Sequence, residues 1–459
     1  MIDLYGPLLA KALFPAFEAA RGRPTVGLLR SLRETERWTP GALRDLQVGL
    51  LRRVLRHAYR HTEFYRQLLD DRGLSPEDFR SVEDLDKLPL LERPTVRTSI
   101  DARTADVPPR PVITKTTSGS SGEPVTVRYN AESRHWRDAT RWRGYGWAGY
   151  RIGMRAMHYW GSAPSAANWW KRKKVQVDHL VKRDLYVDCT PRGDDALLDA
   201  VARMRKFRPQ VIVAYANGAG ALARFVNDRG LRDWDPIPVL TGAERLLPHD
   251  RAAIEQAFGP AFDTYGCREV MMIGSECEAH DGMHTAMENL IVELVVREPD
   301  GTVRAARPGE SGEVVVTDLH NLACPMIRYV TGDVAVARGD ARCACGRGLI
   351  RIGPIEGRVT ETLVDAQGRA VSGLVFNVVL AIIGDATRAF QVVQRRDRSI
   401  VLKIVPFRGD GLPERETRML REYADRYFPG VPLTIEVVGD IPLTPAGKRQ
   451  PVVVERVDR

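Results

Sequence analysis

Apolar residues recur along the chain in blocks whose spacing switches between a helical and a strand period. A helical spacing runs through 43–69, and the Pro-rich stretch at 84–96 indicates a loop. Helix-like and strand-like stretches then alternate, at 195–207, 211–216, 220–230 and 236–244. Alternation of this kind predicts an α/β core.

The pattern changes in the last third of the chain. Strand-like runs at 289–296 and 312–319 predict a β-rich section, and a new series begins near Arg358. It comprises strand-like 361–365, helix-like 374–383, strand-like 389–395 and 399–406, helix-like 414–428 and strand-like 433–439. About a hundred residues is an ordinary domain size, so we predict one domain over 1–357 and a small α+β domain over 358–459.

The composition is that of a globular protein, with 459 residues of which 44% are hydrophobic and 28% charged. Its 68 Lys and Arg exceed its 59 Asp and Glu, and the resulting +9 suits an anionic ligand such as a nucleotide. The clearest basic runs, KRKK at 171–174 and QRRDR at 394–398, are short and indicate solvated faces. No nucleic-acid-binding module is recognised, so we expect no nucleic-acid partner.

The first 24 residues are apolar enough to suggest a targeting segment. Lys11, Pro15 and Glu18 interrupt the run, which lacks both a basic start and a small-residue cleavage site. We expect a surface-packed amphipathic helix instead. No other stretch has an uninterrupted apolar span of membrane length, so the protein is expected to be cytoplasmic, without a membrane span.

The stretch TTSGSSGEP at 116–124 concentrates glycines and small hydroxyl side chains. Glycines let successive N–H groups point into one concavity, so the stretch can cradle phosphates, although a solvated turn is the commoner alternative. It is not a Walker A loop, because Gly119 and Gly122 are too close together and Glu123 stands where lysine is required. Any phosphate bound here would need a cation from elsewhere in the chain.

Six cysteines with uneven spacing do not resemble a disulfide framework. Two of them lie in CACG, as Cys343 and Cys345, and a third begins CEAHDGMH, as Cys277. Together with His284 or His280 they could supply three sulfurs and one nitrogen, a ligand set that zinc favours. Free, buried cysteines are the plain alternative.

A competing fingerprint lies at 217–223, where NGAGALA fits G-x-G-x-x-A directly after a strand-like run. A nicotinamide oxidoreductase using 218–223 is therefore an alternative. The acid that should end the second strand is missing, since Asp233 and Asp235 precede the next apolar run. We accordingly interpret Gly218 and Gly220 as turn and helix-packing residues.

Seven motifs identify a family by their order. They are TTSGSSGEP (116–124), TGAE (241–244), TYGCREV (264–270), IRYVTGD (327–333), CACGR (343–347), IEGR (355–358) and IPLTPAGKRQ (441–450). In this order they resemble the core motifs of the adenylate-forming acyl-CoA synthetases, and more narrowly those of the phenylacetate-CoA ligase and CapK-like branch. The stretch 57–91 resembles the same branch, and the likeness runs from about 51 to about 453.

The resemblance implies a large multi-sheet α/β N-terminal domain, a small mobile α+β C-terminal domain and an active site between them. It implies that ATP and a small carboxylic acid form an acyl-adenylate and pyrophosphate. The acyl group then passes to coenzyme A, a carrier protein or an amine. The β- and γ-phosphates would be held by Thr116, Thr117, Ser118, Gly119, Ser120, Ser121 and Gly122.

The resemblance also assigns roles to single residues. Asp333 would accept hydrogen bonds from both ribose hydroxyls, Tyr265 would lie against adenine, and Glu269 would hold Mg²⁺. Arg358 would contact the ribose or phosphate, and Lys448 would bridge the substrate carboxylate and the α-phosphate. The remaining nucleotide contacts would come from Gly242, Ala243, Glu244 and Gly266.

For the metal, the branch commonly reads Cys-Glu-x-x-x-Gly-x-His, which favours His284 over His280. Cys277, His284, Cys343 and Cys345 would then bind a structural Zn²⁺ with no open position. Two departures from the family are Glu123, which removes a loop cation, and the hinge sequence GRVTE, with Glu361 in place of a common aspartate.

Three points stay open in the sequence. They are the identity of the acid, the choice of acceptor, and the assembly, for which a homodimer is one option. A non-catalytic nucleotide-binding protein on the same fold is the alternative from a second functional class.

Overall fold

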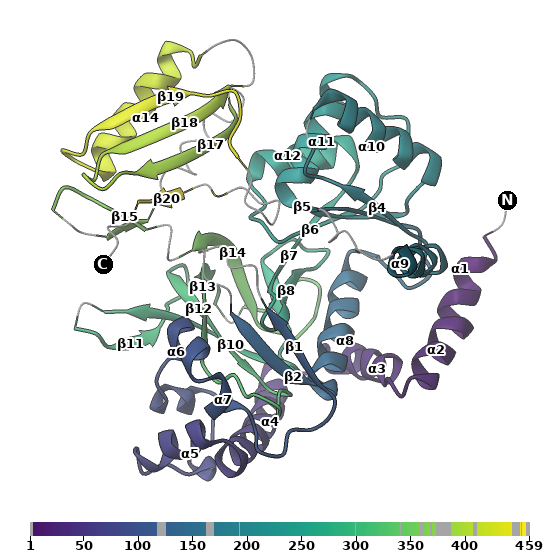
Figure 1. Cartoon of the computed structure of the whole chain (residues 1–459), viewed down its shortest axis with the longest axis vertical. Coiled ribbons are helices and arrows are strands. Elements are labelled where there is room, and N and C mark those ends of the chain that lie inside the picture. The colour runs from purple at the N-terminus through teal and green to yellow at the C-terminus, as the bar shows by residue number, and fades with distance from the viewer. Residues whose placement is uncertain are drawn as a thin grey trace.

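The computed structural model of the chain (Figure 1) describes 3–116, 125–161, 169–191, 193–298, 300–339, 341–358, 362–367, 370–372, 387–406, 411–442, 450 and 452–455. Four predictions lie outside these residues. They concern the hinge acid Glu361, the helix at 374–383, Lys448, and the glycine-rich loop beyond Thr116.

A sheet of twelve strands organises the larger part of the molecule, in the order β11-β10-β12-β13-β14-β9-β8-β7-β6-β5-β3-β4. The strands are β3 Ala156–Trp160, β4 Asp184–Asp188, β5 Val211–Tyr215, β6 Val239–Gly242, β7 Ala261–Cys267, β8 Met271–Glu276, β9 Met283–Thr285, β10 Leu290–Arg297, β11 Val303–Ala305, β12 Ser311–Asp318, β13 Tyr329–Ala337 and β14 Arg351–Arg358. From β4 to β7 the pairing is parallel, whereas β7 and β8 pair antiparallel.

Helices cover both faces of the parallel half (Figure 1). They are α8 Ala131–Trp147, α9 Trp169–Lys182, α10 Asp194–Phe207, α11 Ala216–Asp228 and α12 Pro248–Ala257. Side chains of a strand alternate between faces, so Ile212 and Ala214 of β5 pack with α10, α11 and α12, while Val211 and Val213 pack with the side of α8. Burial on both faces explains why β5 is a continuous apolar run.

A second set of helices begins the chain and lies below and beside the sheet in Figure 1. Its members are α1 Tyr5–Leu8, the π-helical turn η1 Leu9–Leu13, α2 Phe14–Ala20, α3 Thr25–Thr35, α4 Pro40–His61, α5 Glu63–Asp70, η2 Pro76–Asp78, η3 Glu83–Lys87, α6 Arg93–Thr98 and α7 Ile100–Arg103. The hairpin of β1 Val112–Thr116 and β2 Thr126–Asn130 follows. Within the described part of the chain, no helix combines the length and apolarity needed to cross a bilayer.

Three expected elements differ in detail. The helical pattern at 43–69 is two helices, because Thr62 is extended and its hydroxyl caps α5 by accepting from the Tyr65 N–H at 3.3 Å. The loop at 84–96 contains η3 and the start of α6. Helix α11 starts at Ala216, four residues before the predicted 220, so Gly218 lies inside the helix and not in a turn.

A smaller sheet with its own core carries the C-terminal elements (Figure 1). Its order is β19-β18-β17-β20, formed by β17 Thr387–Gln394, β18 Ile400–Pro406, β19 Leu433–Val437 and β20 Val452–Val454. Helix α14 Glu414–Tyr427 packs on it through Leu420 and Ala424. The pair β15 Thr362–Val364 and β16 Ala370–Ser372 lies next in the chain after β14. The domain boundary at 357/358 stays a prediction.

Buried ion pairs join α8 to the sheet. Arg137 donates to Asp318 Oδ2 at 2.8 Å, and the exposures of the two side chains are 3% and 0%. The other carboxylate oxygen of Asp318 accepts the backbone N–H groups of His320 and Asn321. Two charges out of water are tolerated only when such partners surround them.

We predict that Arg137→Met destabilises the fold by about 3–5 kcal/mol, because Asp318 would be left as a buried, unpaired charge. Arg134→Met is a matched control on the same helix. Its partner Asp138 is 3.8 Å away across an exposed pair, for which less than about 1 kcal/mol is expected. Urea unfolding followed by tryptophan fluorescence measures both, and equal losses would contradict a special role for the buried pair.

Candidate active site

The carboxylate predicted to bind ribose is held in place by the tyrosine predicted to contact adenine. Tyr265 on β7 donates its hydroxyl to Asp333 Oδ2 on β13 at 2.9 Å. The Thr331 hydroxyl accepts the Asp333 N–H at 3.1 Å and lies 3.3 Å from the Tyr265 hydroxyl. Burial, with the Asp333 charge second, raises the pKa of Tyr265 well above its ordinary value, so this phenol acts as a neutral donor.

The expected Mg²⁺ ligand has two partners that the sequence did not indicate. Glu269 is 5% exposed and lies just beyond the end of β7. Its Oε1 accepts the Tyr329 hydroxyl at 3.1 Å and lies 3.2 Å from the Arg93 guanidinium. Tyr329 stands in the quoted IRYVTGD motif, whereas Arg93 lies in a stretch predicted to be loop, so only Tyr329 could have been suspected.

A cation lies at the base of the glycine-rich loop. Arg268 donates to the Thr116 carbonyl at 3.0 Å, and the Thr116 and Thr126 hydroxyls are 3.1 Å apart across the β1–β2 hairpin. The loop sequence itself contains no basic residue to neutralise phosphate. Arg268, which belongs to the TYGCREV motif next to Glu269, is therefore the described guanidinium best placed to serve that end of the loop.

The TGAE segment and the residue after it contact three neighbouring elements, β7, α11 and β14. Gly242 ends β6, and a Cβ there would lie 2.8 Å from the Thr264 hydroxyl, while Ala243 has a left-handed φ of 65°. Glu244 Oε2 accepts the Asn217 N–H at 3.1 Å, at the start of α11. Arg245 donates to the Glu356 carbonyl on β14 at 3.0 Å, which connects this segment to the strand that ends at Arg358.

These contacts bear on the dinucleotide alternative. A phosphate-binding fingerprint needs an open helix N-terminus, but the carboxylate of Glu244 already occupies the first turn of α11. A Cβ at Gly220 would lie 2.0 Å from Asp250 Oδ1, and one at Gly218 would lie 3.1 Å from the Cys189 Cβ. Both glycines thus permit helix packing, and the oxidoreductase alternative is not supported.

A further carboxylate that was not predicted lies half-buried on β7, the strand that carries Tyr265. Asp263 on β7 accepts the Thr241 hydroxyl and the Thr264 N–H, each at 3.0 Å. Burial, followed by the charge of Glu276 on β8, raises the pKa of Asp263 to about 7. Arg251 neutralises Glu276 through two hydrogen bonds of 2.8 and 2.9 Å.

Of the predicted hinge at 357–361, the structure describes only Gly357 and the backbone of Arg358. Arg358 faces Asp333 across the antiparallel ladder of β13 and β14, which places the two motifs side by side. Two residues earlier, the Glu356 carboxylate accepts the Ser311 hydroxyl at 2.6 Å. Lys448 lies outside the described residues, so its predicted role is not tested by these contacts.

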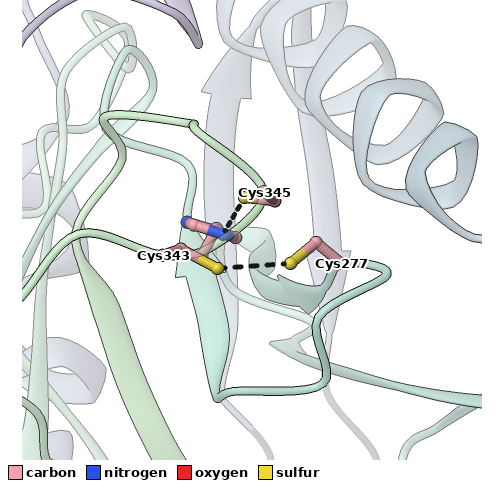
Figure 2. Close-up of side chains that lie close together, drawn as sticks. Cys277, Cys343 and Cys345 are labelled. Atoms are coloured by element: carbon pink, nitrogen blue, oxygen red, sulfur yellow. Dashed lines mark hydrogen bonds between the residues drawn. The ribbon is translucent and has the colours of Figure 1, made fainter.

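The four predicted metal ligands converge. The ligand atoms of Cys277, His284, Cys343 and Cys345 all lie within 4.8 Å of one another. Cys277 Sγ is 3.7 Å from Cys343 Sγ, and Cys345 Sγ is 3.3 Å from His284 Nε2 (Figure 2). The Leu349 carbonyl, 3.0 Å from His284 Nδ1, fixes the ring so that Nε2 faces the sulfurs.

His280, the other nitrogen donor considered, faces a different partner. Its Nδ1 lies 3.3 Å from Glu276 Oε2, so its ring is engaged outside the group of sulfurs. Burial lowers the pKa of His284 to about 4, which keeps that imidazole neutral as a metal ligand must be. Burial also raises the pKa of Cys277 to about 12, a cost that a cation would remove by binding the thiolate.

No family profile matches the chain. A phenylacetate-coenzyme A ligase of Thermus thermophilus is 28% identical over 365 residues, which span 78% of this chain and 79% of that enzyme. One of Escherichia coli is 28% identical over 343 residues, covering 70% and 72%. A solved structure of 2-hydroxyisobutyryl-CoA ligase, in the postadenylation state with R3-HIB-AMP, superimposes with a TM-score of 0.68 at 18% identity and covers 89% of each chain.

The comparisons confirm the predicted fold and the resemblance read from the seven motifs. The finer placement in a CapK-like branch stays a prediction. An anthranilate CoA ligase bound to anthranoyl-AMP agrees less closely, with a TM-score of 0.50 at 17% identity over 73% of this chain and 65% of that one. The chain is therefore a relative of the phenylacetate-coenzyme A ligases and has the fold of the adenylate-forming CoA ligases.

Proposed function

We propose that this protein is an AMP-forming acid ligase, which activates a carboxylic acid with ATP and then transfers the acyl group to a thiol. The observation that carries the proposal is that strand β13 contacts both Tyr265 and Glu269: Asp333 accepts the Tyr265 hydroxyl, and Tyr329 donates to Glu269. These residues come from motifs about 60 positions apart and bring together an aromatic ring and two carboxylates. The sequence likeness to enzymes named phenylacetate-coenzyme A ligase supports the same activity.

In the first step, one oxygen of the substrate carboxylate attacks the α-phosphorus of ATP, and pyrophosphate leaves with the electron pair of the broken P–O bond. Asp333, oriented by Tyr265, would accept the ribose hydroxyls. Glu269 would hold Mg²⁺, a hard cation suited to carboxylate oxygen, provided that Arg93 yields one of its contacts. Lys448 and Arg358 would neutralise charge at the α-phosphate, with Arg268 near the loop end.

In the second step, the acceptor sulfur attacks the acyl carbon and AMP leaves with the bridging oxygen. Coenzyme A is the acceptor that we propose, since it is named in the relatives and in the solved 2-hydroxyisobutyryl-CoA ligase. For the acid, we propose an arylacetic acid first, because the same relatives are named phenylacetate-coenzyme A ligases. A cytoplasmic location, a homodimer and the absence of nucleic-acid binding stay predictions.

We further propose a structural zinc ion on Cys277, His284, Cys343 and Cys345. The support is chemical and geometric, because three sulfurs and one oriented imidazole nitrogen lie close enough to share one ion. A bound zinc would tie the segment after β8 to the loop between β13 and β14. With four protein ligands, the ion would have no open position for substrate, so its contribution is to stability.

The catalytic proposal predicts acid-dependent exchange between ATP and pyrophosphate. A panel of carboxylic acids that includes arylacetic acids should contain at least one that supports exchange, and coenzyme A should then give a thioester. Lys448→Ala should lower exchange by roughly a hundredfold or more with little change in ATP affinity, since a donor to developing charge is lost. ATP binding without turnover for any acid would instead favour a non-catalytic nucleotide-binding protein.

The ribose assignment predicts a selective loss of ATP affinity. Asp333→Asn keeps an oxygen for the Tyr265 hydroxyl but removes the charge, so ATP should bind roughly tenfold more weakly or worse. Gly218→Ala is the control, with a packing cost near Cys189 and unchanged ATP affinity. Calorimetry measures both. NAD binding that Gly218→Ala abolishes would overturn the assignment in favour of the oxidoreductase.

The metal proposal predicts about one zinc per chain in protein washed with chelator. His284→Gln should lose zinc and melt at a lower temperature, because the buried thiols then lack a cation. His280→Gln should retain zinc, since that ring faces Glu276. Elemental analysis and thermal melting make the comparison. A native protein free of metal, or equal zinc content in both variants, would exclude the site.

A further inference from the structure

A stripe of exposed apolar side chains runs along the N-terminal helical arm, which comprises α1, η1 and α2. Leu4 is 77% exposed, Leu8 50%, Leu13 43% and Phe17 44%. The arm lies at the margin of the molecule (Figure 1). Apolar residues scattered singly on a surface need no explanation, but four along one helical arm form a continuous feature.

The stripe stays on one side because of the π-helical turn. Its residues are spaced by four, five and four positions, and the interval of five spans η1 Leu9–Leu13, where a turn takes in one more residue than in an α-helix. The opposite side of the arm, which packs against the protein, also stays in line across the π-helical turn. Leu9 and Glu18 are buried there, and the Phe14 ring packs edge-on against Trp142 with centroids 6.4 Å apart.

Helix α9 extends this apolar surface. Val177 is 58% exposed, Leu180 78% and Val181 46%. The Tyr5 hydroxyl donates to the Val181 carbonyl at 3.0 Å, and Arg183 pairs with Asp3 at 2.8 Å, so the start of the arm and the end of α9 are in direct contact. The two helical segments therefore present their apolar residues from adjoining parts of the surface.

The same segments carry an excess of positive charge. Residues 169–183 contain six Lys and Arg against one Asp, and residues 3–21 contain Lys11 and Arg21, both exposed, against Asp3 and Glu18. Lys182 pairs with Asp178 and Arg183 with Asp3, so the excess comes from the remaining Lys and Arg. Arg21 lies over the Phe17 ring at 4.3 Å, which places a guanidinium directly beside the apolar stripe. A second copy of this chain would bring like charges together across the face, whereas an anionic lipid surface complements both the charge and the apolar side chains.

We propose that this face, defined by Leu4, Leu8, Leu13, Phe17, Leu180 and Val181, docks on the surface of an anionic phospholipid bilayer. The apolar side chains enter the boundary between headgroups and acyl chains, and the neighbouring Lys and Arg side chains contact the lipid phosphates. The protein rests on the membrane and does not span it, and the docking face includes none of the active-site residues. The inference is independent of the reaction that the enzyme catalyses.

Sedimentation of the full chain with vesicles tests the proposal. Vesicles of phosphatidylcholine mixed with phosphatidylglycerol should bind the protein, and vesicles of phosphatidylcholine alone should bind it about tenfold more weakly or not at all. Raising the salt concentration should release it, because the lipid charge is screened. Leu8→Gln combined with Leu180→Gln should weaken binding about tenfold, since two apolar side chains no longer enter the boundary.

The matched control is Leu198→Gln on α10, a side chain that is 42% exposed outside the docking face. It should bind vesicles like the unaltered protein, and all forms should melt alike because glutamine suits an exposed helix position. Four results would overturn the proposal. They are no binding to anionic vesicles, equal binding to both vesicle types, equal loss in the control, or self-association of the protein that the double variant abolishes.

Discussion

Strand β7 is hydrogen-bonded in two directions at once, and the position of the whole site depends on this constraint. On one side it pairs parallel with β6, and on the other it pairs antiparallel with β8. Its carboxyl end therefore lies at the same edge of the sheet as the end of β6, where TGAE lies, and β7 turns directly into β8. The turn is tight, since a Cβ at Gly266 would lie 2.2 Å from the Met271 carbonyl oxygen. Ligands of open α/β sheets bind at such carboxyl ends.

The same strand pair links the proposed nucleotide site to the cysteine cluster. Asp263 on β7 donates its N–H to the Glu276 carboxylate on β8 at 2.9 Å, and Cys277 follows Glu276 directly. Arg251 holds Glu276 from α12. A structural ion at Cys277 would thus stabilise the C-terminal end of β8. The N-terminal end of the same strand follows the turn that carries Glu269. In the proposed arrangement, the zinc ion would stabilise the fold, while Glu269 would hold Mg²⁺ for the reaction.

Periodicity in the sequence predicted the helices and strands whose formation depends mainly on the burial of one or both faces. The run at 211–216 became β5 because both of its faces are covered, and the helix at 195–207 became α10. Boundaries set by one hydrogen bond were missed, as at Thr62, whose hydroxyl ends one helix and caps the next. The order of motifs predicted roles for Tyr265, Glu269 and Asp333, which stay predictions. In the structure Tyr265 contacts Asp333, and Glu269 contacts Tyr329 on the same strand as Asp333.

Contacts between segments far apart in the chain could not be predicted from the sequence. Arg93 lies 176 positions from Glu269, and nothing in its local pattern indicates the ion pair. The choice between His280 and His284 rested on resemblance until the positions of Glu276 and Leu349 distinguished the two rings. The contact of Glu244 with the first turn of α11 likewise agrees with interpreting the glycines at 218 and 220 as structural, and not as part of a dinucleotide site.

Activation of the acid as an acyl-adenylate is the chemical step on which the proposed function depends. Its most direct test uses a substrate acid whose two carboxylate oxygens carry a heavy isotope, with mass analysis of the nucleotide product after transfer to coenzyme A. Attack of the carboxylate on the α-phosphorus predicts AMP with one labelled oxygen and pyrophosphate with none. Unlabelled AMP, or ADP with label in inorganic phosphate, would contradict the account.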